Sequence, residues 1–212
     1  MGTEERKERE KLARQEAIMA SARELFFAKG FTATSMDEIA QRTELSKGAL
    51  YLYFASKEVL YATILNEGLK ILFDRIEAAF QLDLPPDQML RKIGEVHYRY
   101  YLDYREYSRI FFFREHRDVA RQLPRELIRD NLEKGMRNFQ RFSEVIQKGI
   151  EQGIFARVDP RKAAVAFWGA TNGILFLFED ELNREMFGMD VEQLIYYTID
   201  LFIEALKKRQ GG

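Results

Sequence analysis

The sequence predicts an all-α protein, and three observations support this prediction. Apolar residues recur every three or four positions along most of the 212 residues, which is the spacing of one face of an α-helix. The chain holds four prolines, and its 46% hydrophobic and 32% charged residues are typical of a helical globular protein. Residues that favour helix N-caps precede several periodic stretches. We expect about nine helices, in a domain over residues 1–56 and a larger domain over residues 57–212.

The first expected helix covers residues 8–29, where Leu12, Ile18 and Leu25 follow the helical period and Gly30 follows as a stop. Three short segments come next, each opened by a serine. Ser35 has Glu38 at the spacing of a capping box, in which each side chain satisfies a free backbone N–H of the other. Ser46 and Ser56 are the next two N-caps, so several abruptly turned helices are expected here.

Longer helices fill the C-terminal domain, and their boundaries follow from prolines, glycines and one aspartate. The expected breaks are Leu84-Pro85-Pro86, a turn near Glu106, a start at Pro124, a stop at Gly153, a start at Asp159-Pro160, and a break at Gly188-Met189-Asp190 before the last helix.

The composition and charge of the chain exclude several kinds of site and function. The absence of cysteine excludes disulfides, thiolate zinc sites and a cysteine nucleophile. The two histidines, His97 and His116, lack the carboxylate spacing of a helical metal site, so we expect no metal, no cofactor and no catalytic residue. The charged start contains no apolar stretch, so we expect no signal peptide or membrane anchor and a cytoplasmic protein. The net charge of −1 does not indicate nucleic-acid binding, so any such binding would depend on a local group of positive charges.

The two short helices opened by Ser35 and Ser46 carry the strongest functional signal. The second presents small and polar residues at its N-terminus, which suits a helix that enters the major groove of DNA. Lys47 is placed for phosphate, Tyr51 for backbone oxygens or base edges, and Ala49 for a thymine methyl group. The candidate DNA-binding residues are Thr34, Ser35, Ser46, Lys47, Gly48, Ala49, Tyr51, Tyr53 and Lys57.

Roughly residues 17–65 closely resemble the DNA-binding domain of the TetR family of transcription regulators. The matching positions are Arg23, Leu25-Phe26, Gly30-Phe31, Thr34, Ile39-Ala40, Ser46-Lys47-Gly48, Leu50-Tyr51, Tyr53-Phe54, Lys57-Glu58 and Leu60. One departure is the turn Thr43-Glu44-Leu45, where the family usually has Ala-Gly before the aliphatic residue. A non-glycine residue in a left-handed turn carries a modest cost, and Glu44 adds a negative charge near the DNA face.

The resemblance implies a homodimer formed by the last two long helices and a small-molecule effector held among the central helices. Gly169 and Gly173, four residues apart, allow close contact of the penultimate long helix. The apolar run from Ala163 to Phe178 is shorter than a membrane span, and a dimer interface accounts for it better. The expected interface residues are Phe167, Ile174, Leu194, Thr198, Leu201 and Phe202.

Aromatic residues crowd the stretch from Tyr98 to Phe113, and this cluster has two interpretations of similar weight. It either lines a pocket for a bulky apolar or aromatic ligand, with nearby arginines for a carboxylate or phosphate, or it packs as ordinary core. The candidate ligand-binding residues are Tyr98, Tyr101, Arg109, Phe112, Phe139, Trp168 and Asn172.

These features together predict a homodimeric regulator that binds a near-palindromic operator. The resemblance implies a repressor that a ligand releases from DNA, as is commonest in the family, and we expect a hydrophobic or aromatic ligand of the lipid or acyl type or of the multidrug type. The alternative is a dimeric helical small-molecule-binding protein without specific operator recognition, supported by Glu44. A small helical enzyme would need a convergent acid–base pair, which the sequence does not show.

Overall fold

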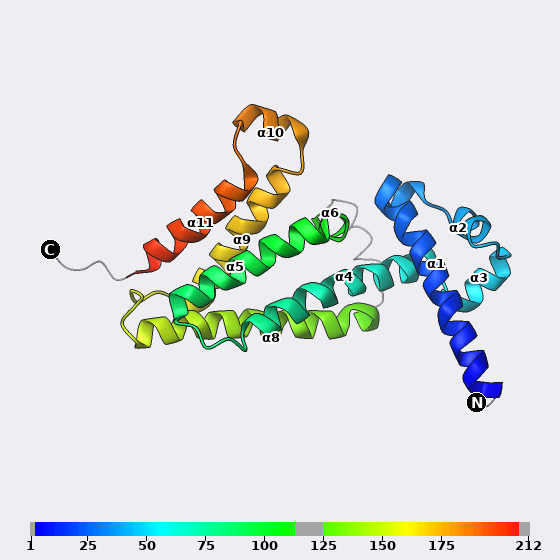
Figure 1. Cartoon of the computed structure of the whole chain (residues 1–212), viewed down its shortest axis with the longest axis horizontal. Coiled ribbons are helices and arrows are strands. Elements are labelled where there is room, and N and C mark those ends of the chain that lie inside the picture. Colours follow the sequence, from blue (N-terminus) through cyan, green and yellow to red (C-terminus); the bar gives the residue numbers. More distant parts are fainter. Residues whose placement is uncertain (1–2, 113–124, 208–212) are drawn as a thin grey trace. The chain divides into compact units, whose positions relative to one another are not determined.

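The computed structural model describes residues 3–112 and 125–207, and these residues are all-α. Ten helices lie in these ranges, without a β-sheet, which confirms the predicted fold class (Figure 1). No helix in the described ranges is both long and apolar enough to cross a lipid bilayer. Pro124 and His116, which the sequence singled out, lie outside the described residues.

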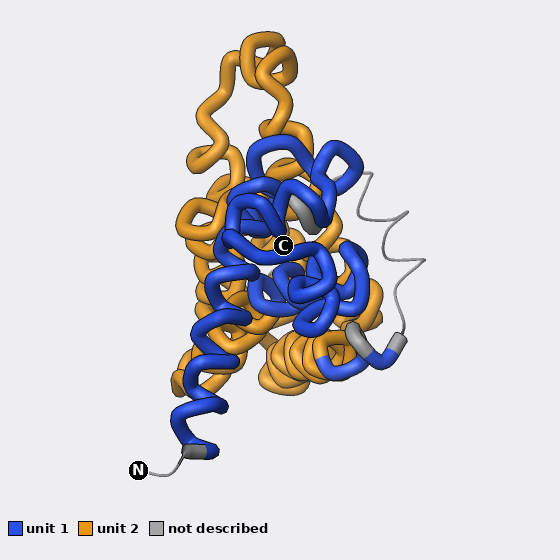
Figure 2. Tube along the Cα trace, turned by 90° about the vertical axis from the view of Figure 1, so that its right-hand side faces the viewer, with its two compact units in different colours: residues 1–69, 106–130 blue, residues 70–105, 131–212 orange. Residues whose placement is uncertain are grey.

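The helices form two compact units (Figure 2). The first unit comprises residues 1–69 and 106–130, and the second comprises residues 70–105 and 131–212. The sequence placed a boundary between residues 56 and 57, where helix α4 (Lys57–Ala79) begins. The first unit extends further, to Leu69, because Leu60 and Ile64 of α4 are fully buried in its core.

Helix α1 (Thr3–Ala33) carries a break at the predicted stop. Gly30 has φ 82° and ψ 174°, a conformation that side chains with a Cβ rarely adopt, and the chain turns there. Helices α2 (Met36–Arg42) and α3 (Lys47–Tyr53) begin where the serine caps predict. The Ser35 hydroxyl accepts from the Glu38 N–H at 3.2 Å, and the Ser46 hydroxyl accepts from the Ala49 N–H at 3.1 Å.

One apolar core holds these short helices together. Ile18 of α1, Ile39 of α2 and Leu50 of α3 are fully buried against the first turns of α4. Each such side chain contributes about 1.5–3 kcal/mol by leaving water, which far exceeds what helices of seven residues supply by themselves. The short helices are therefore held in place by tertiary packing.

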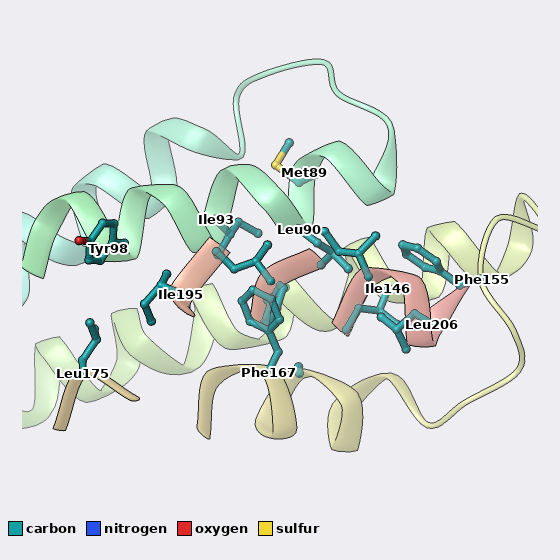
Figure 3. Packing of buried hydrophobic residues seen from close by; sticks show 14 of the residues in the cluster. Met89, Leu90, Ile93, Tyr98, Ile146, Phe155, Phe167, Leu175, Ile195 and Leu206 are labelled. Atoms are coloured by element: carbon teal, nitrogen blue, oxygen red, sulfur yellow. The ribbon is translucent and has the colours of Figure 1, made fainter. Parts of the chain in front are cut away.

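The second unit is built on long helices. Their bounds are α5 Pro86–Asp103, α8 Arg125–Glu151, α9 Pro160–Leu177 and α11 Val191–Leu206, and α6 (Arg105–Phe112) follows α5 after one residue. Helix α11 packs against both α5 and α9. Figure 3 shows the core they enclose, with Leu90 of α5, Ile146 of α8, Phe167 of α9 and Ile195 of α11 packed together.

A short helix, α10 (Glu181–Phe187), was missed by the sequence analysis, which expected the preceding helix to reach Gly188. Helix α9 instead ends at Leu177, and the carboxylate of Asp180 accepts from the N–H groups of Leu182 and Asn183 to start a new helix. Gly188 ends α10 in the left-handed conformation, with φ 57°.

Candidate functional site

Helix α3 presents one face to its own core and the opposite face to solvent. Leu50 is fully buried, while Tyr51 is 42% exposed and Leu52 is 87% exposed. Ser46, Lys47 and Gly48, at the start of the helix, are exposed as well, and a Cβ at Gly48 would meet nothing within 4 Å. The burial of Leu50 therefore fixes the orientation of the helix, and its small, basic and aromatic residues face the solvent.

Leu52 was not among the predicted contact residues, although the pattern contained a signal for it. Leu52 follows the buried Leu50 by two positions, and this spacing places the two side chains on opposite sides of a helix. An exposed leucine on this face is suited to the methyl group of thymine in a major groove. We add Leu52 to the candidate contact residues.

The turn between α2 and α3 contains the departure noted in the sequence. Glu44 has φ 55°, and it is the one non-glycine residue of the described ranges with positive φ. The turn is closed by backbone hydrogen bonds from the Glu44 N–H to Gln41 at 3.2 Å and from the Leu45 N–H to Ala40 at 2.9 Å. The tight turn therefore forms without glycine, at the expected cost in backbone strain.

Replacing Glu44 by glycine should raise the free energy of unfolding by about 1 kcal/mol, because glycine adopts positive φ without a Cβ clash. Glu44→Ala is the matched control, since it removes the same carboxylate and keeps the strain. Urea unfolding checks the difference between the two variants. Equal stability of both variants would show that the turn is unstrained.

Lys47 is paired with a carboxylate on its own exposed surface. Its ammonium group lies 2.8 Å from the Asp37 carboxylate, and both side chains are more than half exposed. The hydrogen bond to Asp37, followed by its charge, raises the pKa of Lys47 above 10.5, so Lys47 stays cationic. Asp37 orients this charge and also competes with a phosphate for it.

Two predicted DNA-binding residues have internal roles. Thr34 is 2% exposed, and its hydroxyl donates to the Gly30 carbonyl at 2.8 Å. The Lys57 ammonium donates to the carbonyls of Phe31 and Thr34, both at 2.8 Å, and lies 4.1 Å from the centre of the Phe31 ring. Both side chains therefore bond to the turn after α1.

The remaining predicted DNA residues divide by exposure. Ser35 and Ser46 are exposed and act as N-caps, Ala49 is half-buried, and Tyr53 packs against the core of the first unit. The exposed candidate residues are Ser35, before α2, and Ser46, Lys47, Gly48, Tyr51 and Leu52, at the start and on the outer side of α3. We call the last five the α3 face.

Three tyrosines of the predicted aromatic cluster, Tyr98, Tyr100 and Tyr101, are buried in the second unit. The rings of Tyr98 and Tyr101 stack with centroids 6.3 Å apart, and Phe139 packs against the same core. Burial raises the pKa of both phenols to about 12. The Tyr101 hydroxyl donates to the carboxylate of Glu179, to which the Arg105 Nε also donates at 3.1 Å. The cluster thus contains polar groups that are already paired.

The other predicted ligand residues are dispersed. Arg109 belongs to the first unit and lies 3.5 Å from the Glu106 carboxylate, and the side chain of Phe112 lies outside the described residues. Trp168 is 50% exposed, and Asn172 donates its side-chain N–H to the Trp168 carbonyl at 2.7 Å. Of the predicted set, the structure gathers Tyr98, Tyr101 and Phe139 around one core.

His97 lies in α5 with Tyr98 and Tyr101, and its side chain is buried. Burial lowers its pKa from 6.5 to about 4, so the folded protein keeps it neutral where the unfolded chain would protonate it. The unfolded state then binds more protons between these two values, and stability falls as the pH falls. The described residues contain no cluster of histidine and acidic side chains that could hold a metal ion.

Lowering the pH from 6.5 to about 4 should therefore cost roughly 3 kcal/mol of folding free energy through His97 alone. Urea unfolding of the protein and of His97→Gln at several pH values measures this contribution as the difference between their pH slopes. Identical slopes would show that His97 titrates normally in the folded state.

Tyr107 joins α6 to the N-terminal helices inside the first unit. Its hydroxyl donates to Glu67 of α4 at 2.6 Å, and Glu67 also accepts from Arg23 of α1 at 2.9 and 3.1 Å. The Tyr107 ring lies edge-on to Phe27, with centroids 5.2 Å apart. A Cβ at Gly68 would lie 2.5 Å from the same ring, so only glycine admits it at this distance. We call these five residues the α6 junction.

Helices α9 and α11 expose apolar side chains along one stripe each. Val165, Trp168 and Phe176 are about half exposed on α9, and Tyr197 and Leu201 are 63% and 56% exposed on α11. Gly169 and Gly173 lie on the same side of α9, and a Cβ at either would meet nothing within 4 Å. An exposed apolar surface of this extent is typical of a protein–protein interface.

Some of the predicted interface residues lie on this exposed surface, and others are partly or fully buried. Leu201 is on it, while Ile174, Leu194 and Thr198 are half-buried. Phe167 is 3% exposed, packed against Phe142 and Phe202 with ring centroids 5.2 and 5.1 Å away. Phe167 thus belongs to the core of its own unit, and Trp168 takes its place on the exposed stripe.

Two parts of the chain match described protein families. Residues 18–64 match bacterial regulatory proteins of the tetR family, and residues 83–176 match the tetracyclin repressor-like C-terminal domain. The first range contains the α3 face. The second contains Tyr98, Tyr101 and Phe139, which we call the aromatic core.

Relatives and solved structures agree with these matches. The chain is 29% identical over 201 residues to the uncharacterized HTH-type transcriptional regulator YfiR of Bacillus subtilis (86% of this chain, 89% of YfiR). It is 28% identical over 160 residues to the HTH-type transcriptional regulator RutR of Escherichia coli (75% of this chain, 72% of RutR). The crystal structure of PfmR from Thermus thermophilus, a TetR family transcriptional regulator, superposes with a TM-score of 0.71 at 27% identity (90% and 99% of the two chains). AibR, solved with isovaleryl coenzyme A and operator DNA, gives a TM-score of 0.67 at 23% identity (92% and 98%).

Proposed function

The chain belongs to the TetR family of transcription regulators, and we propose from this that it is a homodimeric repressor released from its operator by a small hydrophobic or aromatic ligand. The family and the similar proteins are regulators of transcription and not enzymes. Because its target is operator DNA, we expect it to work in the cytoplasm.

The α3 face is the observation that carries the proposal. It sets a lysine, an exposed glycine, a tyrosine and an exposed leucine on one side of a short helix whose other side is anchored by the fully buried Leu50. These are groups for phosphate contact, close backbone approach and contact with base edges. Their orientation is fixed by packing, which a sequence-specific contact requires.

A homodimer is supported by the apolar stripes of α9 and α11. Two copies related by a two-fold axis would each place α3 in successive major grooves, about 34 Å apart, so the operator should be near-palindromic.

Ligand control is supported by the α6 junction, because α6 directly follows the aromatic helix α5 and is bonded to α1 and α4 through Tyr107. A ligand that shifts α6 would act on the N-terminal helices, and a coupling of about 1–3 kcal/mol is enough for a useful switch. AibR, which has the same fold, was solved with both an acyl coenzyme A and operator DNA. We propose a ligand of the lipid or acyl type, with a multidrug-type ligand as the alternative.

Selection of random duplex DNA by the purified protein at physiological salt tests the proposal. We expect the retained DNA to contain a near-palindrome, and release of that DNA then serves as the assay for ligands. Recovery of only salt-sensitive, sequence-blind binding would overturn operator recognition. It would favour the alternative, a dimeric small-molecule-binding protein.

Lys47→Ala and Tyr51→Ala should each weaken binding to the selected operator about tenfold, because each removes a contact from the α3 face. Lys47→Ala should also lower the salt dependence by about one counterion. Lys162→Ala, which removes an 87% exposed lysine on α9, is the matched control and should have no effect. Affinity unchanged at matched salt would remove the tested residue from the interface.

A further inference from the structure

A surface groove of the second unit lies outside the aromatic core and the α9–α11 stripes. It has a volume of about 580 Å³, which is in the range of small-molecule sites. Its lining residues are Arg75, Ala78, Ala79 and Leu82 from α4 and the turn after it, Lys92, Glu95, Val96 and Arg99 from α5, and Tyr196 from α11.

Two helical stripes face each other across this groove. Positions 75, 78 and 79 lie on one side of α4, positions 92, 95, 96 and 99 lie on one side of α5, and Leu82 lies in the turn after α4. The α5 stripe is not the side that α5 turns to the core, because Leu90, Ile93 and Tyr101 are buried there. The groove is therefore a separate surface from the aromatic core.

The charge of the groove is positive, and part of it is not neutralised within the described residues. Arg75 is paired with Asp103 at 2.7 Å, and Lys92 lies 3.7 Å from Glu95. Arg99 is exposed, and the described residues give it no hydrogen bond or ion pair. Two other arginines near the aromatic residues are paired, since Arg105 is bound to Glu179 and Arg109 lies 3.5 Å from Glu106.

The remaining lining is apolar. Ala78, Ala79 and Val96 line the groove, and Leu82 there is 45% exposed. The Tyr196 ring packs edge-on against Tyr98, with centroids 6.0 Å apart. Apolar lining with a few placed cations suits a ligand that has a charged head and an apolar chain. The guanidinium group of Arg99 is able to bind two oxygens of a carboxylate or phosphate at once.

We propose that this groove binds a small organic anion with an apolar chain, and that Arg99 holds its carboxylate or phosphate head. The inference goes beyond the proposed function, because it requires neither operator DNA nor a ligand in the aromatic core. Lys92 adds to the attraction, and the apolar side chains of both stripes contact the ligand chain.

Isothermal titration calorimetry of the full chain without DNA tests this, with octanoate and octyl phosphate as probes and octan-1-ol as the uncharged control. We expect both anions to bind and octan-1-ol to bind at least about tenfold more weakly. Binding should weaken as NaCl rises from about 0.05 M to about 0.5 M, since the site is exposed to solvent. No binding of either anion at millimolar concentration would overturn the proposal.

Two variants locate the site. Arg99→Gln should weaken binding of both anions at least about tenfold and leave octan-1-ol binding unchanged. Val96→Glu should also weaken both anions, because it places a negative charge in the groove. Arg161→Gln, an exposed arginine of α9 outside the groove, is the matched control and should bind as the parent does. Unchanged affinity in Arg99→Gln, in a protein whose helix content is intact, would place the anion elsewhere and refute the assignment. Operator selection is a separate measurement, so one of the two proposals can be refuted while the other stands.

Discussion

Leu201→Glu should convert the proposed homodimer to a monomer and abolish operator binding. Leu201 is 56% exposed in the isolated chain, so the substitution leaves the core of its own unit intact. In a two-fold interface it would place two carboxylates in an apolar contact, one from each copy. An unpaired charge buried in an interface costs several kcal/mol, so we expect the dimer Kd to rise by about three orders of magnitude or more.

Sedimentation equilibrium measures this change, and the fluorescence of Trp168 gives a second readout. Trp168 is the only tryptophan and is half exposed on the α9 stripe, so its emission should shift to the red when the interface opens. Leu132→Glu is the matched control, because Leu132 is also 56% exposed but lies on α8. A Leu201→Glu protein that still sediments as a dimer would show that these stripes are not the interface.

Phe202→Glu is less suitable for this test. The Phe202 ring lies edge-on against Phe167, with centroids 5.1 Å apart, and Phe167 is buried in the core. A charge at position 202 would therefore unfold the unit as well as open an interface, and a monomer would not identify the cause.

The predictions that the structure confirms most closely depend on local interactions. Gly30 and the caps Ser35 and Ser46 act through backbone groups within a few residues, so the sequence alone specifies them. The positive φ of Glu44 was expected from the resemblance, because the family usually has glycine in this turn. Helix α10 was missed because the Asp180 cap lies within a run of residues that otherwise continue the helical pattern.

The contacts of predicted site residues that the sequence did not indicate join positions far apart in the chain. Lys57 bonds to carbonyls 23 and 26 residues before it, and no local pattern specifies that bond. Helix α9 is apolar on most sides, so its period does not tell whether Phe167 or Trp168 faces the core. The packing of α9 against α11 decides it.

The sequence also did not predict the α6 junction. Arg23 and Tyr107 lie 44 and 40 residues from Glu67 along the chain, and Gly68 has no local reason to be glycine. The role of Gly68 becomes visible only when the Tyr107 ring is seen against it.

Tyr107→Ala should destabilise the first unit by about 3 kcal/mol, because it removes an aromatic ring that is packed against Phe27 and Gly68. Tyr107→Phe keeps the ring and removes only the hydrogen bond to the Glu67 carboxylate, so it should cost about 1–2 kcal/mol. Urea unfolding of the two variants separates the contribution of the ring from that of the hydroxyl. Equal losses would mean that the ring contributes nothing beyond its hydrogen bond.

The same pair tests whether the junction transmits the effect of a ligand. If α6 acts on the N-terminal helices through Tyr107, Tyr107→Ala should bind the selected operator within about twofold of the parent and fail to release it when the ligand binds. Tyr107→Phe should still release it, at a higher ligand concentration, because the ring remains seated on Gly68. Gly68→Ala should resemble Tyr107→Ala, since its Cβ displaces the ring that the tyrosine variant deletes. Normal release by Tyr107→Ala would show that the signal reaches α3 by another route, and the junction would then only stabilise the first unit.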